Sequence, residues 1–411
     1  MLAELKSLSH SQRSAIWASY LGWTLDAFDY FLMVFMLSAI AKDFHTDIKA
    51  VTYGIFLTLA ARPAGAFLFG WLAERFGRRP VLMVDIILFS VLELASGFAP
   101  SLTTLLILRF CFGVAMGGEW GLGASLVMES IPPKLRGPVS GLLQSGYPSG
   151  YFVASLVFFL LFDRIGWRGM FMVGVAPALL VLLIRIHVEE SPVFAARQEK
   201  GRSGPWWEPV RQVLGHWKIA LYLVVLMTAF NFFSHGTQDL YPTFLQKQNH
   251  FGTHLTGVLA AVMNLGAIVG GIGFGIWSER IGRKRGIIIA SLLALPVIPL
   301  WAYAATPLLL GLGAFLIQVA VQGAWGVVPV HLNELSPPAA RALFPGFAYQ
   351  LGNLIASWNS PLQAHIAEGR HDDYGFALAL VAGVTAVVLV IWTAVGPERR
   401  DVDFVAEAKS A

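Results

Sequence analysis

The chain has 411 residues, of which 56% are hydrophobic and 13% are charged, and its formal net charge is +4. A soluble protein of this size carries about 25% charged residues, so the composition excludes an ordinary soluble enzyme and indicates an integral membrane protein. The one cysteine, Cys111, lies in an apolar run and offers neither a disulfide framework nor a metal cluster. Residues 1–10 are too polar for a signal peptide.

Apolar runs follow one another along the chain, and each is long enough for the roughly 20 residues that a spanning helix needs. Twelve such runs start near Ile16, Val51, Pro80, Leu102, Gly137, Trp167, Ile219, Gly257, Gly286, Leu308, Phe344 and Tyr374. We therefore predict an all-α membrane protein with twelve transmembrane helices. An N-terminal six-helix bundle (1–187) and a C-terminal six-helix bundle with a short cytoplasmic tail (219–411) are joined by a charged cytoplasmic linker (188–218).

The basic residues are distributed unevenly over the connections between these runs. If the runs alternate in direction, 21 of the 29 Lys and Arg residues lie on the side of the N-terminus, and six lie on the opposite side. Basic residues accumulate on the cytoplasmic side of membrane proteins, so we expect both termini to be cytoplasmic. The positive charge therefore reports topology in a lipid bilayer, and no nucleic-acid partner is expected.

Two unrelated motifs recur along the chain with one common offset. Residues 70–79 (GWLAERFGRR) recur as residues 275–284 (GIWSERIGRK), and residues 129–136 (ESIPPKLR) recur as residues 334–341 (ELSPPAAR). The offset is 205 residues in both cases. A shared offset of this kind predicts two six-helix halves arranged as a parallel repeat.

Charged residues within the runs are concentrated in the first half. Asp26, Asp29, Arg62, Arg109 and Glu119 all fall inside apolar runs, where an unpaired charge is costly, so each is expected to be paired or to face a cavity. For Arg62, an ion pair and a ligand role remain equally open. Asp85 and Glu93 in the third run are further candidates. The repeat counterparts of the first five are uncharged, namely Asn231, Ser234, Ala267, Ala314 and Ala324. Such asymmetry suits a small anion held between the halves.

The seventh run contains the most polar stretch, residues 231–243 (NFFSHGTQDLYPT). On a helix, five of its polar residues fall within an arc of about 140°, namely Asn231, Ser234, His235, Gln238 and Asp239. At membrane depth such a face must look onto protein or a water-filled cavity. Interhelical hydrogen bonds that only hold the bundle together are the alternative explanation. A His and an Asp within four residues favour a substrate and proton pathway.

The repeated loop motifs resemble those of the major facilitator superfamily, and the resemblance covers the whole chain. Charged groups at a cytoplasmic helix end can pair when that side closes and separate when it opens. A role in orientation alone would explain the charges but not the Gly and Glu residues at matched spacing. The resemblance implies a gating role for Gly70, Glu74, Arg75, Gly77, Arg78, Gly275, Glu279, Arg280, Gly282 and Arg283.

Within this superfamily, residues 231–243 resemble the seventh-helix signature of the Jen-type lactate/pyruvate:proton symporters, in the sialate:proton symporter group. Residues 23–31 and 349–353 are also similar to this group. The resemblance implies that Arg109 binds the substrate carboxylate and that Gln350 selects the substrate. It further implies that Asn231, His235, Gln238 and Asp239 handle the substrate and the proton. From the residues themselves we add Arg62 and Tyr30 as candidates for substrate binding, and Asp26, Asp29 and Glu119 as candidates for proton coupling beside His235 and Asp239.

The sequence therefore predicts a proton-coupled symporter of short monocarboxylates, such as lactate or pyruvate, that works by alternating access as a monomer. The run count and short termini suggest a bacterial inner-membrane protein. The alternatives are a symporter of sialic, aromatic or dicarboxylic acids, a drug:proton antiporter, or a transport-like receptor. An enzyme is not expected, because the histidines lack metal spacing and no nucleophile motif occurs. We expect no cofactor.

Overall fold

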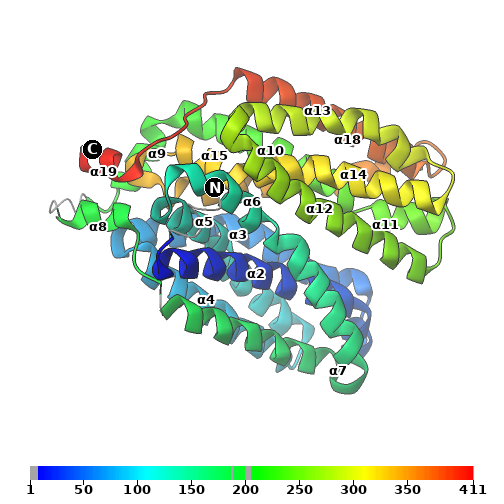
Figure 1. Ribbon diagram of the computed structural model, residues 1–411. Helices are drawn as coiled ribbons and strands as arrows, with labels where there is room; N and C mark the ends of the chain where they lie inside the picture. Colours follow the sequence, from blue (N-terminus) through cyan, green and yellow to red (C-terminus); the bar gives the residue numbers. More distant parts are fainter. Residues whose placement is uncertain (1–7, 187, 200–204, 411) are drawn as a thin grey trace.

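The structure is a computed structural model that describes residues 8–186, 188–199 and 205–410 of the chain. These residues form helices joined by short turns, and no strand occurs among them (Figure 1). The predicted all-helical architecture is therefore confirmed.

The first half begins with long helices that span the bundle from end to end. It contains α2 (His10–Asp43), α3 (Ile48–Phe76), α4 (Arg78–Gly97), α5 (Leu102–Ser130), the 3₁₀ turn η1 (Pro133–Leu135), α6 (Arg136–Gln144) and α7 (Gly146–Ile186). Within α7, Gly166 adopts φ 63° and ψ −178°, which interrupts the helix between the fifth and sixth predicted spans. A positive φ of this kind costs glycine little, because it has no Cβ atom.

The helices of the second half are interrupted more often than those of the first half. The second half contains α10 (Trp217–Gln238), α11 (Tyr241–Thr243), the π-helical turn η2 (Phe244–Gln248), α12 (Thr253–Ile281), α13 (Arg283–Tyr303), α14 (Pro307–Gly326), α15 (Val328–Leu335), the 3₁₀ turn η3 (Pro338–Ala340), α16 (Phe344–Ala356), α17 (Asn359–Glu368) and α18 (Tyr374–Val395). The eleventh predicted span is divided between α16 and α17 at Ser357 and Trp358.

Ten helical segments among the described residues are long and apolar enough to cross a membrane. The other two predicted spans are helical as well. The sixth is the part of α7 that follows Gly166, and the eleventh is formed by α16 and α17 together. Every run that the sequence predicts to span the membrane thus forms helix in the structure.

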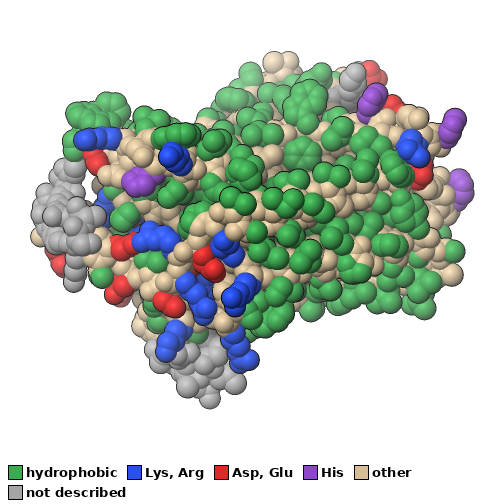
Figure 2. Space-filling model, turned by 90° about the horizontal axis from the view of Figure 1, so that it is seen from above, with side chains coloured by type: hydrophobic (Ala, Val, Ile, Leu, Met, Phe, Trp, Pro, Cys, Tyr) green, Lys and Arg blue, Asp and Glu red, His purple; other side chains and the backbone are tan. Residues whose placement is uncertain are grey.

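The two halves lie side by side and meet most closely at one end (Figure 1). That end carries both chain termini and the short helices α8 (Pro192–Glu199), α9 (Glu208–Gly215) and α19 (Phe404–Ser410), and we call it the terminal face. The predicted linker, 188–218, contributes α8 and α9, while α10 already begins at Trp217. Figure 2 shows charged side chains gathered at this end and hydrophobic side chains covering the middle of the molecule.

Glycines allow the backbones of the two halves to approach each other near the terminal face. A Cβ atom added to Gly121 of α5 would lie 2.6 Å from the Cα atom of Gly346 in α16. A Cβ atom added to Gly70 of α3 would lie 2.7 Å from the Cα atom of Leu343. Side chains at these positions would therefore force the halves apart, because packed backbones leave no room for an added carbon.

The C-terminal helix α19 adds a contact to both halves at this face. The ring centroid of Phe404 lies 3.6 Å from the guanidinium carbon of Arg136 in α6 and 3.9 Å from that of Arg341. These two arginines are equivalent in the repeat, one from each half. The Arg341 Nη2 atom also lies 2.7 Å from Glu407 Oε2. Helix α19 is thus bound to both halves while the terminal face is closed.

We predict that Gly121→Val separates α5 from α16 and opens the terminal face. The measurement is labelling of a Ser125→Cys reporter, in a Cys111→Ser background, by a membrane-impermeant thiol reagent. Ser125 is buried, and its hydroxyl donates to the carbonyl of Arg341 across the interface. Labelling should rise several-fold in the Gly121→Val protein. Gly273→Val is the matched control, because a Cβ atom added there meets nothing within 4 Å. Equal labelling of the two variants would contradict the prediction.

Candidate functional site

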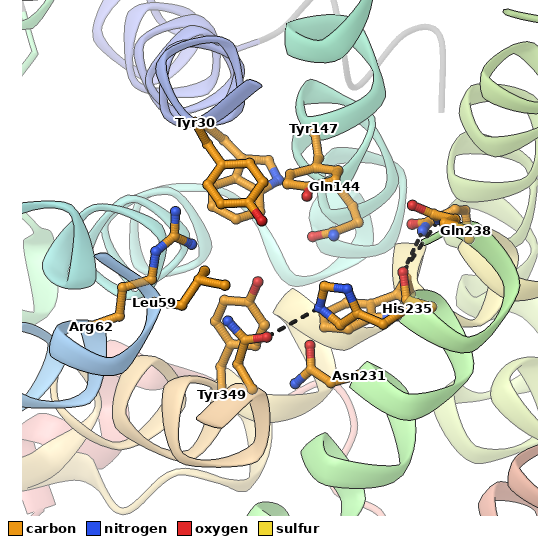
Figure 3. Close-up of a pocket in the computed structure, with 14 residues that line it drawn as sticks. Tyr30, Leu59, Arg62, Gln144, Tyr147, Asn231, His235, Gln238 and Tyr349 are labelled. Atoms are coloured by element: carbon orange, nitrogen blue, oxygen red, sulfur yellow. Dashed lines mark hydrogen bonds between the residues drawn. The ribbon is translucent and has the colours of Figure 1, made fainter. Parts of the chain in front are cut away.

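A cavity of about 750 Å³ lies between the two halves, toward the end opposite the terminal face. Its lining comes from the parts of α2, α3, α7, α10, α11, α12, α16 and α17 that lie far from the terminal face, with Phe35, Tyr151, Asp239, Met263 and Ser360 among the residues. A smaller inner pocket of about 40 Å³ lies deeper, lined among others by Trp23, Arg62, Gln144, Asn231 and Tyr349 (Figure 3). Tyr30, Tyr147 and His235 border both spaces, so the pocket adjoins the cavity.

His235 lies between two oxygen atoms at the junction of cavity and pocket. Its Nδ1 atom is 3.2 Å from Asp239 Oδ1, one helical turn along the chain, and its Nε2 atom is 3.1 Å from Asn353 Oδ1 in α16. The Ser360 hydroxyl of α17 donates to the other carboxylate oxygen of Asp239 over 2.9 Å. Only an imidazolium donates from both ring nitrogens at once, so this arrangement of acceptors suits a charged ring.

Other polar side chains of α10 bind neighbouring helices. The Gln238 side-chain amide donates to Gln318 Oε1 of α14 over 3.0 Å, and the Gln322 amide donates to the Ser234 hydroxyl over 3.1 Å. The Asn231 amide donates to the carbonyl of Met227, one turn earlier in its own helix, over 2.8 Å. These side chains therefore line the pocket and also hold the second half together, as interhelical hydrogen bonds do in membranes.

Arg62 of α3 is the arginine that lines the inner pocket. Its Nη2 atom lies 3.8 Å from Asp26 Oδ2 and 2.8 Å from the sulfur of Met116, and its guanidinium carbon is 5.8 Å from the ring centroid of Tyr30. A thioether is a weak acceptor, and 3.8 Å is too long for a hydrogen bond. Arg62 therefore keeps donor capacity for a carboxylate in the pocket.

Arg109 of α5 has a different environment, inside the first half. Its Nη2 atom lies 2.7 Å from Glu93 Oε2 and 2.6 Å from Ser96 Oγ, both on α4. Its guanidinium carbon lies 4.2 Å from the ring centroid of Phe112 and 4.9 Å from that of Phe171. Arg109 lines neither the cavity nor the pocket. In this conformation its partner is a carboxylate of the protein.

The remaining predicted acids lie behind the pocket rather than in it. Asp26, Asp29 and Glu119 are buried and line neither space. Asp29 lies close to the ion pair of Arg109 and Glu93. A Cβ atom added to Gly174 would touch both acids, at 3.1 Å from Asp29 Oδ1 and 3.3 Å from the Cγ atom of Glu93. Gln350 is also buried outside both spaces, and its side-chain amide has no hydrogen-bond partner among the described residues.

The repeated loop motifs form matching contacts at the terminal face. The backbone N–H of Ala342 donates to Glu74 Oε1 over 2.6 Å, and the backbone N–H of Gly137 donates to Glu279 Oε1 over 2.5 Å. Each bond joins one half to the other, and the two donors are equivalent in the repeat. Within each half, the helix after the loop motif, α4 or α13, begins with an arginine that pairs with a glutamate. These pairs are Arg78 with Glu129 at 3.2 Å and Arg283 with Glu334 at 3.1 Å.

The glycines of these motifs have backbone roles. Gly77 and Gly282 have φ values of 99° and 100°, which side chains with a Cβ atom adopt only at a cost. A Cβ atom added to Gly275 would lie 2.6 Å from the carbonyl oxygen of Gly137 in the other half. Arg75 and Arg280 are exposed.

Several residues that line the pocket were not predicted from the sequence as site residues. They are Trp23, Gln144, Tyr147, Trp325 and Tyr349. The internal repeat could have indicated two of these residues. Gln144 and Tyr349 are separated by the same 205 residues as the loop motifs. Their positions in the two halves are therefore equivalent, and a polar residue at both was a reason to suspect a shared site.

A family model described as "Major Facilitator Superfamily" matches residues 17–274, more than half of the chain. The chain belongs to the major facilitator superfamily. A second model, "Sugar (and other) transporter", matches residues 218–399. The chain is therefore a membrane transporter and not an enzyme, and the predicted twelve-helix fold is confirmed.

Curated relatives include transporters of organic acids. The "Carboxylic acid transporter protein homolog" of Saccharomyces cerevisiae is 28% identical, over 97% of this chain and 70% of that protein. The sialic acid transporter NanX of Escherichia coli is 28% identical over 94% of both chains. The "Probable 4-methylmuconolactone transporter" of Cupriavidus pinatubonensis is 32% identical over 87% of this chain and 84% of that protein.

Among solved structures, the proton:xylose symporter XylE superposes with a TM-score of 0.80 at 18% identity, covering 97% of this chain and 98% of that one. The likeness establishes the arrangement of the helices in this superfamily transporter.

We predict that Glu93 and Arg109 are strongly coupled in stability. A double-mutant cycle of Glu93→Gln and Arg109→Gln, read by unfolding in detergent, should give a coupling energy of about 2–3 kcal/mol, because each single change leaves a buried charge without its partner. Asp43 and Arg168 are the control pair, with side chains 46% and 39% exposed at 2.9 Å. That exposed pair should couple by less than about 1 kcal/mol. Equal coupling in the two pairs would contradict the prediction.

Proposed function

We propose that this transporter is a proton-coupled symporter of short monocarboxylates such as lactate or pyruvate, with Arg62 as the carboxylate anchor. The observation that carries the proposal is a guanidinium with spare donors in a pocket between the halves. A guanidinium presents a planar fork that matches a carboxylate and stays charged at any physiological pH. The names of the relatives support an organic anion as the substrate.

The size of the inner pocket supports a small substrate. A cavity needs about 10–15 Å³ to hold one water molecule. The inner pocket, at about 40 Å³, therefore holds about three waters, which is comparable in size to a three-carbon acid. Sialic, aromatic and dicarboxylic acids remain the alternative substrates, and the relatives named for sialic acid and methylmuconolactone keep them open. A larger anion would have to extend from Arg62 into the outer cavity.

In this proposal the substrate carboxylate and the Asp26 carboxylate compete for Arg62, and this competition couples transport to protons. When the pocket is empty, Arg62 balances the charge of the buried carboxylate of Asp26. A substrate carboxylate on Arg62 removes this balance, and a carboxylate that is buried without a partner binds a proton rather than remaining charged. His235 and Asp239 border the outer cavity and provide the entry point for that proton. Asp29 and Glu119 are proposed as further proton carriers behind the pocket.

We further propose that the terminal face is cytoplasmic, as the distribution of basic residues favours, and that the protein is a monomer of the bacterial inner membrane. The conformation is then outward-facing, with the cavity open toward the outside. The paired Glu74 and Glu279 contacts act as the cytoplasmic gate, which breaks when one half rocks against the other around the site.

Uptake of labelled lactate into proteoliposomes should test the coupling. Uptake should increase as the external pH falls and should collapse when a protonophore is added, because the proton gradient drives accumulation. In the His235→Ala protein, accumulation should fall more than lactate exchange does, since exchange does not require return of an empty, deprotonated carrier. Uptake that ignores both pH and the protonophore would remove symport from consideration.

The anchor is tested by binding of lactate beside its uncharged amide, lactamide. Wild-type protein should prefer the acid strongly. Arg62→Lys keeps the charge but loses the two-pronged geometry, so it should lose about 1–2 kcal/mol of that preference. Arg109→Lys is the matched variant and should keep the preference, because Arg109 lies outside the pocket. The reverse outcome would assign the anchor to Arg109 and return Arg62 to a structural ion pair.

A further inference from the structure

Three tyrosine hydroxyls converge on the inner pocket from different helices. Tyr30 comes from α2, Tyr147 from α7 and Tyr349 from α16, and Figure 3 shows their hydroxyl groups directed toward the space beside Arg62 and His235. None of these hydroxyls forms a hydrogen bond with another residue in the part of the chain that the structure describes. A phenol hydroxyl in a narrow pocket is a strong donor and acceptor that needs a partner.

Each of the three tyrosine rings packs against aromatic or cationic neighbours, and the Tyr30 ring also lies 5.1 Å from that of Phe31. The ring of Tyr147 lies 5.6 Å from that of Trp23, and the ring of Tyr349 lies 4.6 Å from that of Trp120. The ring of Tyr30 lies 5.8 Å from the guanidinium carbon of Arg62. Edge and offset contacts of this kind stabilise ring orientation as well as burying area. The hydroxyl groups are therefore preorganised before any substrate arrives.

Apart from Arg62 and the indole N–H of Trp23, several polar groups that line the pocket already have partners in the protein. Asn231 donates within its own helix, Gln238 is held by Gln318, and both ring nitrogens of His235 face acceptors of the protein. Recruiting any of these to a substrate would break an existing hydrogen bond, and the exchange would yield little net free energy. The tyrosine hydroxyls are free of this cost.

We infer that Tyr30, Tyr147 and Tyr349 form a recognition site for a second oxygen of the substrate, beside the carboxylate. This inference rests on the proposed function and narrows it to 2-hydroxy and 2-oxo monocarboxylates. A hydroxyl group both donates and accepts, so the same three residues serve an alcohol and a ketone. Because Tyr30 lies against Arg62, the oxygen that it contacts is close to the anchored carboxylate, as it is on the adjacent carbon of a 2-hydroxy acid. A plain acid such as propionate leaves the hydroxyls without a partner.

The experiment measures binding of lactate, pyruvate and propionate to the purified full-length protein, in wild type and in Tyr30→Phe, Tyr147→Phe and Tyr349→Phe. Wild type should bind lactate and pyruvate at least ten-fold more tightly than propionate. Each Phe variant keeps its ring and should lose three- to ten-fold in lactate affinity, the range expected for one hydrogen bond, while propionate affinity stays within two-fold. Tyr151→Phe is the control, since Tyr151 lines only the outer cavity.

Equal wild-type affinity for lactate and propionate would overturn the inference while leaving the proposed monocarboxylate function intact. Parallel losses for lactate and propionate in the Phe variants would also overturn it, because they would assign the tyrosines to packing. Should wild type bind none of the three acids, the proposed function fails and the inference fails with it. If one variant does not fold, the remaining two decide, because each hydroxyl comes from a separate helix.

Discussion

The cost of placing a charge at membrane depth organises this structure. An arginine there must have a carboxylate partner or a polar space. The chain contains both solutions: Arg109 is held by Glu93 inside the first half, whereas Arg62 lies 3.8 Å from Asp26 and faces the pocket. The first arrangement lies away from both the pocket and the cavity. The second places a guanidinium beside a protein carboxylate and at the pocket between the two halves.

Closure of the terminal face depends on a few contacts that the repeat provides twice. The Glu74 and Glu279 carboxylates each accept a backbone N–H from the opposite half, and glycines allow the close approach. A typical intramolecular hydrogen bond contributes only about 0.5–1.5 kcal/mol net, because water can replace either partner. The ring of Phe404 adds a further link, because it contacts an arginine from each half.

The polar face of α10 both forms interhelical hydrogen bonds and lines the space between the halves. Gln238 and Ser234 join α10 to α14, which is the role of interhelical hydrogen bonds. His235 borders both the pocket and the cavity, Asp239 lines the cavity, and their partners come from α16 and α17. These contacts therefore link three helical segments of the second half.

The sequence alone determined the class, the spans, the repeat and the polar character of α10, because hydropathy, charge distribution and a fixed 205-residue offset are properties of the linear chain. It also placed Arg62, His235 and Asp239 among the site residues that line the pocket or cavity. Only the tertiary structure decided that Arg109 faces Glu93 and that Tyr147 and Tyr349 face the pocket. The direction in which a buried side chain points depends on how each helix is rotated against its neighbours. That rotation is set by packing between segments far apart in the sequence, which periodicity within one helix does not encode.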